Sequence, residues 1–250
     1  MPAQLRIVGA LVLCELLLRT EVALPVHARA LQAGPPIQRE TCSVTIPSED
    51  DESWQLLHYS NIPTNGVDFS TLGLRIQVDH SAAPLVYPLT VPIAVARLAV
   101  RGRVDGDLRV APQRQGEEGF DDYVLRAGLV LAGSRRLGFF RRMFAPEWVK
   151  RLYALALPNQ GISNVRFFNI GTDPDQIGQH RVHPLSNLFE EEVVAVPRAD
   201  GTFEFDVPLI PPVEAVAVWL SSDGDDTGSV FTVLVERITL STAAAALSSC

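Results

Sequence analysis

Residues 72–79, LGLRIQVD, alternate apolar and polar side chains without a break. Successive side chains of a β-strand point to opposite faces of the sheet, so this pattern predicts a strand with one buried face. The pattern recurs along the chain, most clearly in residues 125–131, 216–220 and 231–235. Clusters of Gly, Pro, Asn and Asp separate the runs. We therefore predict a mainly β protein, an antiparallel β-sandwich of jelly-roll type.

One segment has a helical period instead. Pro146 stands where the first helical turn begins, Trp148, Leu152 and Leu155 share one face, and Pro158 ends the pattern. This predicts one inserted helix over residues 145–157.

The stretch FFRRMF, residues 139–144, precedes that helix. We expect its aromatic side chains to pack on the sandwich. The alternative is a patch that binds a membrane surface.

The first thirty residues have the three-part plan of a secretory signal peptide. Arg6 is the basic lead, residues 7–18 are mostly apolar, and Ala28-Arg29-Ala30 is a small-x-small cleavage site. The apolar run is shorter than the roughly 20 residues that a spanning helix needs. We expect an exported protein, periplasmic or extracellular, with no integral membrane span after cleavage. An uncleaved amphipathic anchor is the alternative.

Composition divides the remaining chain into three parts. Residues 31–53 are interpreted as an N-terminal segment that precedes the core, 54–240 as a single β-sandwich domain and 241–250 as a flexible C-terminal tail. Two cysteines follow the cleavage site, Cys42 and Cys250, and in an oxidising compartment such a pair can form a disulfide. The favoured interpretation leaves Cys250 at the end of a disordered tail, and the disulfide is the alternative.

The chain is acidic, with a formal net charge of −8 at pH 7. Residues 1–30 hold three arginines and two glutamates, so their removal takes the charge to −9. This balance argues against nucleic acid as a partner and against attraction to anionic lipid. The chain also lacks a nucleophile elbow, a P-loop and a dinucleotide fingerprint.

The acidic turn at residues 223–228, DGDDTG, is the best metal candidate. Clustered carboxylates can bind Ca²⁺ through hard oxygen ligands, so Asp223, Asp225 and Asp226 are the predicted ligands, and we expect no other cofactor. An EF-hand is excluded because Leu234 stands where its bidentate Glu would be. The favoured interpretation is nevertheless a turn open to water that binds no ion, and the calcium site is the alternative. A second candidate, His180 and His183, lies in a loop beside Pro184 and is disfavoured.

Candidate ligand-binding residues are Asp122 and Tyr123, at the start of a strand, and Trp148. A carboxylate near aromatic rings can bind a sugar, which predicts a non-catalytic glycan-binding module. Trp54, Tyr87 and Trp219 are further aromatic candidates, although Trp54 and Trp219 lie in strand patterns typical of a core.

Two alternatives remain. One is a glycan-active hydrolase or lyase that uses carboxylates such as Asp122 and Asp226. The other is an envelope protein with a structural or partner-binding role. The oligomeric state stays open.

Three pieces of the sequence together carry a family resemblance. They are DDYVLRA at 121–127, RFFN at 166–169 and DGDDTG at 223–228. Segments 54–56, 74–76 and 85–104, which precede these pieces, occur in the same order as in the family. Over residues 54–240 the chain resembles, as a divergent member, a family of exported bacterial proteins, domain-of-unknown-function family 3047. The resemblance implies a jelly-roll sandwich similar in shape to carbohydrate-binding modules, without an assigned activity.

Overall fold

The computed structural model describes residues 42–48, 52–158, 160–184 and 186–242, all within the compact unit Arg39–Cys250. The predicted signal peptide and Cys250 lie outside these residues, and so does the predicted tail from residue 243 on. Cleavage and export therefore stay predictions. None of the helices among the described residues is long and apolar enough to cross a membrane.

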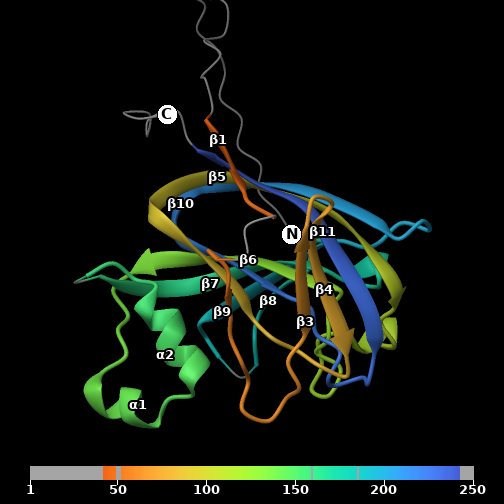
Figure 1. Ribbon diagram of the computed structural model, residues 1–250, viewed down its shortest axis with the longest axis horizontal. Helices are drawn as coiled ribbons and strands as arrows, with labels where there is room; N and C mark the ends of the chain where they lie inside the picture. The colour runs from red at the N-terminus through yellow and green to blue at the C-terminus, as the bar shows by residue number, and fades with distance from the viewer. Residues whose placement is uncertain (1–41, 49–51, 159, 185, 243–250) are drawn as a thin grey trace, which may run out of the picture. The chain divides into compact units, whose positions relative to one another are not determined.

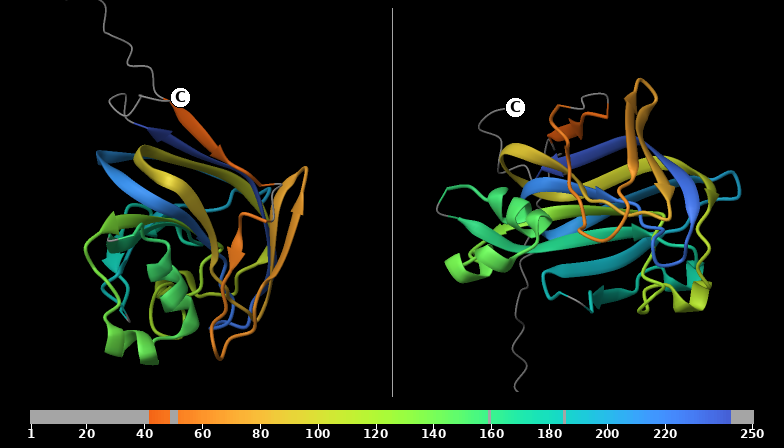
Figure 2. Two further views of the ribbon diagram at one scale, coloured as in Figure 1. Left: turned by 60° about the vertical axis from the view of Figure 1, so that its left-hand side comes forward. Right: turned by 60° about the horizontal axis from the view of Figure 1, so that its bottom comes forward.

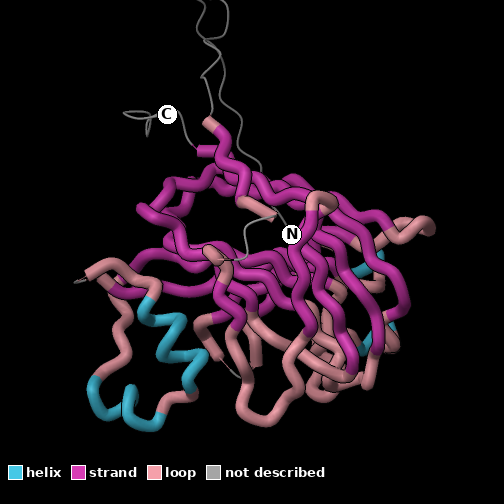
Figure 3. Tube along the Cα trace, viewed as in Figure 1, coloured by secondary structure: helices cyan, strands magenta, loops and turns pink. Residues whose placement is uncertain are grey.

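The predicted mainly β sandwich is confirmed (Figures 1 and 3). One 11-stranded sheet has the order β3-β4-β11-β5-β10-β6-β7-β9-β8, with β1 added to β11 and β2 to β5. Its pairs are antiparallel except β7 with β9. The strands are β1 (Ser43–Ile46), β2 (Gln55–Leu56), β3 (Gly66–Ser70), β4 (Gly73–Asp79), β5 (Leu85–Asp107), β6 (Leu125–Gly133), β7 (Gly161–Ile170), β8 (His180–Val182), β9 (Phe189–Ala195), β10 (Thr202–Ser221) and β11 (Val230–Thr242).

Two long strands, β5 and β10, carry the sheet from one layer of the sandwich to the other. They pair along most of their lengths, and their register shifts between Pro208 and Val213 and again between Ala215 and Ala217. Such irregularities bend a strand and increase its twist, and both strands curve visibly in Figure 2. The layers meet across the core, where the rings of Phe168 and Phe205 lie 6.3 Å apart.

The main core lies between the layers and contains most of the side chains that alternation predicted. Leu74, Ile76 and Val78 of β4 are buried there, together with alternate residues of β6 such as Leu125 and Leu129. Leu72 is an exception, 67% exposed, because it stands in the turn before β4. Val216 is another, because the register shift beside it moves its side chain to a second cluster.

The second cluster lies on the opposite face of β6, β7 and β10. It contains Val130, Phe167 and Trp219 from these strands and Leu152 from a helix. β6 and the last part of β10 are therefore buried on both faces. The structure also confirms the core interpretation of Trp54 and Trp219, which are 6% and 1% exposed.

The predicted single helix is two short helices, α1 (Phe139–Phe144) and α2 (Glu147–Ala154), and α2 falls within the predicted range. Short 3₁₀ turns occupy Pro112–Arg114 and Pro174–Gln176. The favoured expectation for the FFRRMF stretch is wrong, because none of the residues of α1 is buried. Leu152 and Trp148 of α2 contact the second cluster instead, so α1 extends beyond it.

The sheet also begins earlier than the predicted domain boundary at residue 54. β1 pairs with the end of β11, and Ile46 is buried in the main core. Cys42, just before β1, is disulfide-bonded. Pairing with Cys250 stays a prediction, because that residue lies outside the described part of the chain.

Candidate functional site

A cavity of about 490 Å³ lies on the side of the sheet that faces away from the main core. Its strand residues alternate with core residues: Arg126 stands between Leu125 and Ala127, and Trp219 between Val218 and Leu220. Loops and α2 complete the wall. The cavity thus collects side chains from segments that lie far apart in the sequence.

Aromatic rings form one part of the wall. Trp148 on α2 lies 5.6 Å from Tyr59, 6.1 Å from Phe189 and 6.3 Å from Trp219 between ring centroids. Phe167 lies 5.7 Å from Trp219. These separations are typical of edge-to-face and tilted aromatic pairs, so the rings hold one another in place.

Gly128 of β6 makes room for this aromatic wall. It pairs with Phe167 across the β6–β7 ladder. A Cβ atom at residue 128 would lie 2.6 Å from Cδ1 of the Phe167 ring. Only glycine leaves the ring of Phe167 where it is.

A buried arginine, Arg126, forms the centre of the polar part. Its Nε donates to Asp223 Oδ2 at 2.6 Å, its Nη1 pairs with Glu191, and its Nη2 donates to the carbonyl oxygen of Asp121. Burial alone would lower the pKa of Arg126, but Glu191, Asp223 and Asp121 raise it well above the usual range. The guanidinium therefore stays charged, and its carboxylate partners offset the free-energy cost of burying it.

Arg181 of β8 extends this network. It pairs with Glu191 and Asp121 and donates to the carbonyl oxygen of Gly116. Gly116 has a φ of +92°, and a Cβ there would lie 2.6 Å from Nη1 of Arg181. A side chain at residue 116 would therefore both strain the backbone and displace the guanidinium.

Asp121 is held by three basic groups. His183 Nε2 lies 2.8 Å from Asp121 Oδ2, and both Arg126 and Arg181 lie beside the same carboxylate. Burial opposes ionisation, but Arg126, His183 and Arg181 outweigh it and hold the pKa of Asp121 well below its usual range. This carboxylate is ionised at any physiological pH.

The two acidic segments of the sequence meet at the cavity. Asp122, 1% exposed, accepts hydrogen bonds from the backbone N–H of Asp226 at 3.3 Å and from the N–H and hydroxyl of Thr227 at 2.8 and 2.6 Å. In return, Asp226 accepts from the N–H of Asp121 at 3.1 Å. Burial nevertheless raises the pKa of Asp122, despite these donors. Asp122 therefore fixes the acidic turn in place.

Two carboxyl groups of that turn have pKa values raised above the usual range of an aspartate. Burial raises the pKa of Asp223 to about 7, although Arg126 opposes the shift. Burial and the charge of Asp122 raise the pKa of Asp225 to about 6. Asp225 is half-buried in the cavity wall and forms no ion pair with a described residue.

The predicted ligand-binding residues have different positions. Asp122 and Trp148 line the cavity. Tyr123 does not; it is 2% exposed, and its ring lies 4.5 Å below the Arg126 guanidinium and 5.7 Å from that of Arg181. Arg126 and Glu191 were not among the predicted site residues, because local spacing does not show which residues a buried arginine pairs with. A basic residue in a strand with apolar residues on both faces was the available signal.

Calcium at Asp223, Asp225 and Asp226 stays a prediction. All three residues line the cavity, and Asp223 is paired with Arg126. Among the described residues, no group of three or more His, Cys, Asp or Glu side chains is arranged to hold a metal ion.

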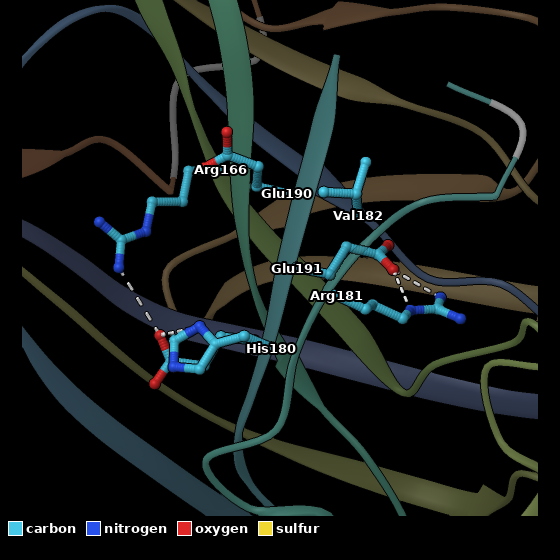
Figure 4. A pocket seen from close by; sticks show the side chains of 7 residues that line it. Arg166, His180, Arg181, Val182, Glu190 and Glu191 are labelled. Atoms are coloured by element: carbon cyan, nitrogen blue, oxygen red, sulfur yellow. Dashed lines mark hydrogen bonds and ion pairs between the residues drawn. The ribbon is translucent and has the colours of Figure 1, made fainter. Parts of the chain in front are cut away.

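A second hollow, of about 500 Å³, runs along β8 and β9. Figure 4 shows Arg181 pointing to Glu191, whereas Arg166 and His180 pair with Glu192 at 3.8 and 3.6 Å. Its basic groups are thus already paired with carboxylates, and no aromatic ring other than His180 lines it among the described residues. We therefore place the candidate site in the aromatic-walled cavity.

Comparisons with known proteins give only distant similarities. No family model and no curated protein matches the chain. Among solved structures, a xylan-binding module, CBM15, is similar with a TM-score of 0.35 and 10% identity over 82% of this chain and 98% of that one. Xylanase10C from Cellvibrio japonicus, in complex with xylopentaose, has a TM-score of 0.33 and 9% identity over 80% of this chain and 28% of that one.

Proposed function

We propose that this chain is a carbohydrate-binding protein and that the cavity described above holds a short neutral saccharide. The observation that carries the proposal is the meeting of aromatic rings and carboxylates in one cavity of about 490 Å³. This volume falls within the roughly 300–1,000 Å³ typical of small-molecule sites.

The chemistry of a sugar matches this lining. A pyranose ring has an apolar C–H face, which packs on aromatic rings such as Trp148, and hydroxyl groups that donate to carboxylates such as Asp225 and Asp226.

The charge of the cavity favours a neutral ligand. Eight Asp and Glu residues line it, against one arginine and one histidine. Asp121, Glu191 and Asp223 are paired with Arg126 or Arg181, but Asp225 and Asp226 are not paired with a described basic group. An anionic sugar, such as a uronic acid, would be repelled.

Titration calorimetry of the full chain against neutral and acidic oligosaccharides tests the proposal. Trp148→Ala and Asp225→Asn should each weaken binding of a neutral oligosaccharide at least tenfold. Phe140→Ala and Asp200→Asn are matched controls, because both residues are exposed and do not line the cavity. If the chain binds no neutral saccharide, or if all four variants bind alike, the proposal is wrong and a structural or partner-binding role becomes the better hypothesis.

A second candidate function, glycan cleavage, is favoured by the raised pKa of Asp225, about 6. A carboxyl group that is still partly protonated near neutral pH can donate a proton to a leaving group. Asp226 is the exposed carboxylate beside it, whereas Asp122 is occupied by three hydrogen bonds to the turn. Under this hypothesis Asp225 is the acid, Asp226 is the base or nucleophile, and Asp122 positions the turn.

Release of reducing ends separates the two functions. If the chain cleaves a saccharide that it binds, Asp225→Asn should abolish cleavage. Asp226→Asn should abolish cleavage as well. If reducing ends are released by neither the wild type nor the variants, the binding function stands alone.

A further inference from the structure

The surface of α1 is apolar to an unusual degree. Its four large apolar side chains, Phe139, Phe140, Met143 and Phe144, are 75%, 76%, 57% and 82% exposed. The helix buries no residue. Soluble proteins rarely expose apolar side chains together in this way unless the patch has a partner.

The same region carries positive charge on an acidic protein. Residues 133–157 hold six basic residues and one acidic residue, Glu147, whereas the whole chain has a net charge of −8. Glu147 lies within 3.5 Å of both Lys150 and Arg151. Charges act over about 8 Å at physiological salt, so a partner of α1 meets this local positive charge and not the negative total.

A small basic hollow lies beside α1. It has a volume of about 160 Å³, and Arg136, Arg142 and Lys150 line it. No carboxylate of a described residue lines it. Three basic side chains around a hollow of this size suit a phosphate group.

We propose that the surface formed by α1 and this hollow docks on an anionic phospholipid bilayer. The phenylalanines would enter the interface between headgroups and acyl chains, and the hollow would take a headgroup phosphate. Figures 1 and 3 place α1 at the outer end of the helical excursion from the sheet, a projection that suits insertion better than a flat protein contact. The acidic remainder of the chain is repelled by the same bilayer, which orients α1 toward it.

Local fluorescence tests the docking independently of any binding by residues 1–30. The chain holds three native tryptophans, so the emission of the tryptophan introduced by Phe140→Trp is taken as the difference from the wild type. Vesicles of phosphatidylcholine and phosphatidylglycerol should shift this emission to shorter wavelength, and brominated lipid in them should quench it. Vesicles of phosphatidylcholine alone should change it far less. Leu72→Trp, an exposed apolar position elsewhere, is the control and should not respond. If the two variants respond alike, the proposal is wrong.

Charge variants test the hollow. In the Phe140→Trp background, Arg136→Gln with Arg142→Gln and Lys150→Gln should weaken the response to anionic vesicles at least tenfold. Arg75→Gln with Arg109→Gln and Arg237→Gln, three exposed arginines elsewhere, should weaken it less than threefold. Equal losses in the two triple variants would overturn the proposal.

Two further measurements distinguish the bilayer from two other ligands of this surface, a free anion and a second copy of the chain. If inorganic phosphate binds to the hollow but vesicles cause no shift, the site takes a free anion and the bilayer proposal is wrong. If the shift depends on protein concentration in the absence of vesicles, and sedimentation shows a dimer, a second copy of the chain occupies the patch instead. Neither result bears on saccharide binding in the cavity, which Phe140→Ala leaves intact.

Discussion

Two regions of the molecule depart from the usual distribution of side chains, in which charged groups are exposed and apolar groups are buried. The cluster around Arg126 buries charged groups, and the surface of α1 exposes apolar ones. Arg126 is 7% exposed and sits among carboxylates, whereas Phe144 on α1 is 82% exposed. The buried arginine is matched by partners within the fold, since Glu191, Asp223 and Asp121 all contact it. The exposed phenylalanines of α1 are not among the residues that pack in the second cluster. A buried charge is thus stable where the fold supplies its partners, whereas the exposed phenylalanines of α1 are the basis of the docking proposal.

The largest effect is expected from breaking the internal network. Arg126→Met leaves Glu191 and Asp223 buried without their cation, which should lower the free energy of unfolding by about 3–5 kcal/mol. Arg97→Met is the control, because Arg97 forms an exposed pair with Asp206 that is worth at most about 1 kcal/mol. Urea unfolding followed by fluorescence measures both. A loss at Arg126 no greater than at Arg97 would contradict the role given to the network.

The aromatic wall of the cavity should be almost as sensitive. Gly128→Ala brings a Cβ to 2.6 Å from the Phe167 ring, so either the ring or the strand must move. Overpacking of this kind costs about 1–3 kcal/mol and should also weaken saccharide binding. Gly138→Ala is the control, since a Cβ at Gly138 meets nothing within 4 Å. Unfolding and calorimetry on both variants check the difference; equal stability would show that the close approach at Gly128 has no consequence.

The pH dependence of stability should report the acidic turn. The pKa of Asp225 is raised to about 6, so the folded state holds a proton that the unfolded state releases near pH 4. Stability contributed by this group is therefore present at low pH and falls as the pH rises through about 4–6. Asp225→Asn should flatten this fall by about 1 kcal/mol, a value reduced for the partial exposure of the group.

Asp121 works in the opposite direction and provides the internal check. Its lowered pKa contributes stability above pH 4 that is lost as the pH falls further, because its bonds to Arg126 and His183 need the ionised form. Thermal unfolding of wild type and Asp225→Asn between pH 3 and pH 8 measures both effects. An unchanged slope between pH 4 and 6 in the variant would refute the assignment to Asp225.

The smallest effect on stability is expected from substitutions in α1, whose apolar side chains are exposed. Phe139→Ser with Phe144→Ser should change the free energy of unfolding by less than about 0.5 kcal/mol, because α1 buries no residue. Phe167→Ser, which empties a buried site, should cost several times more. Thermal unfolding compares the two. A large loss from the α1 variant would mean that its phenylalanines support the fold after all.

The local elements of the fold could be predicted from the sequence. Alternation in β4, β6 and β11 identified strands and most of their buried residues, because the period of two is a property of the extended backbone. The spacing of Trp148 and Leu152 identified α2 in the same way. The two acidic segments were also recognisable, because several carboxylates stand close together in each of them.

Tertiary structure alone decided what these elements do together. The meeting of Asp122 with Thr227, and of Arg126 with Glu191, depends on strand pairings between residues far apart in the chain, which local periodicity does not contain. The overall charge of −8 also concealed the basic surface beside α1. Whether FFRRMF packs inward or faces water depends on which element covers the second cluster, and α2 occupies that place. Whether a side chain is buried depends on the residues that surround it, and the tertiary structure brings these residues together.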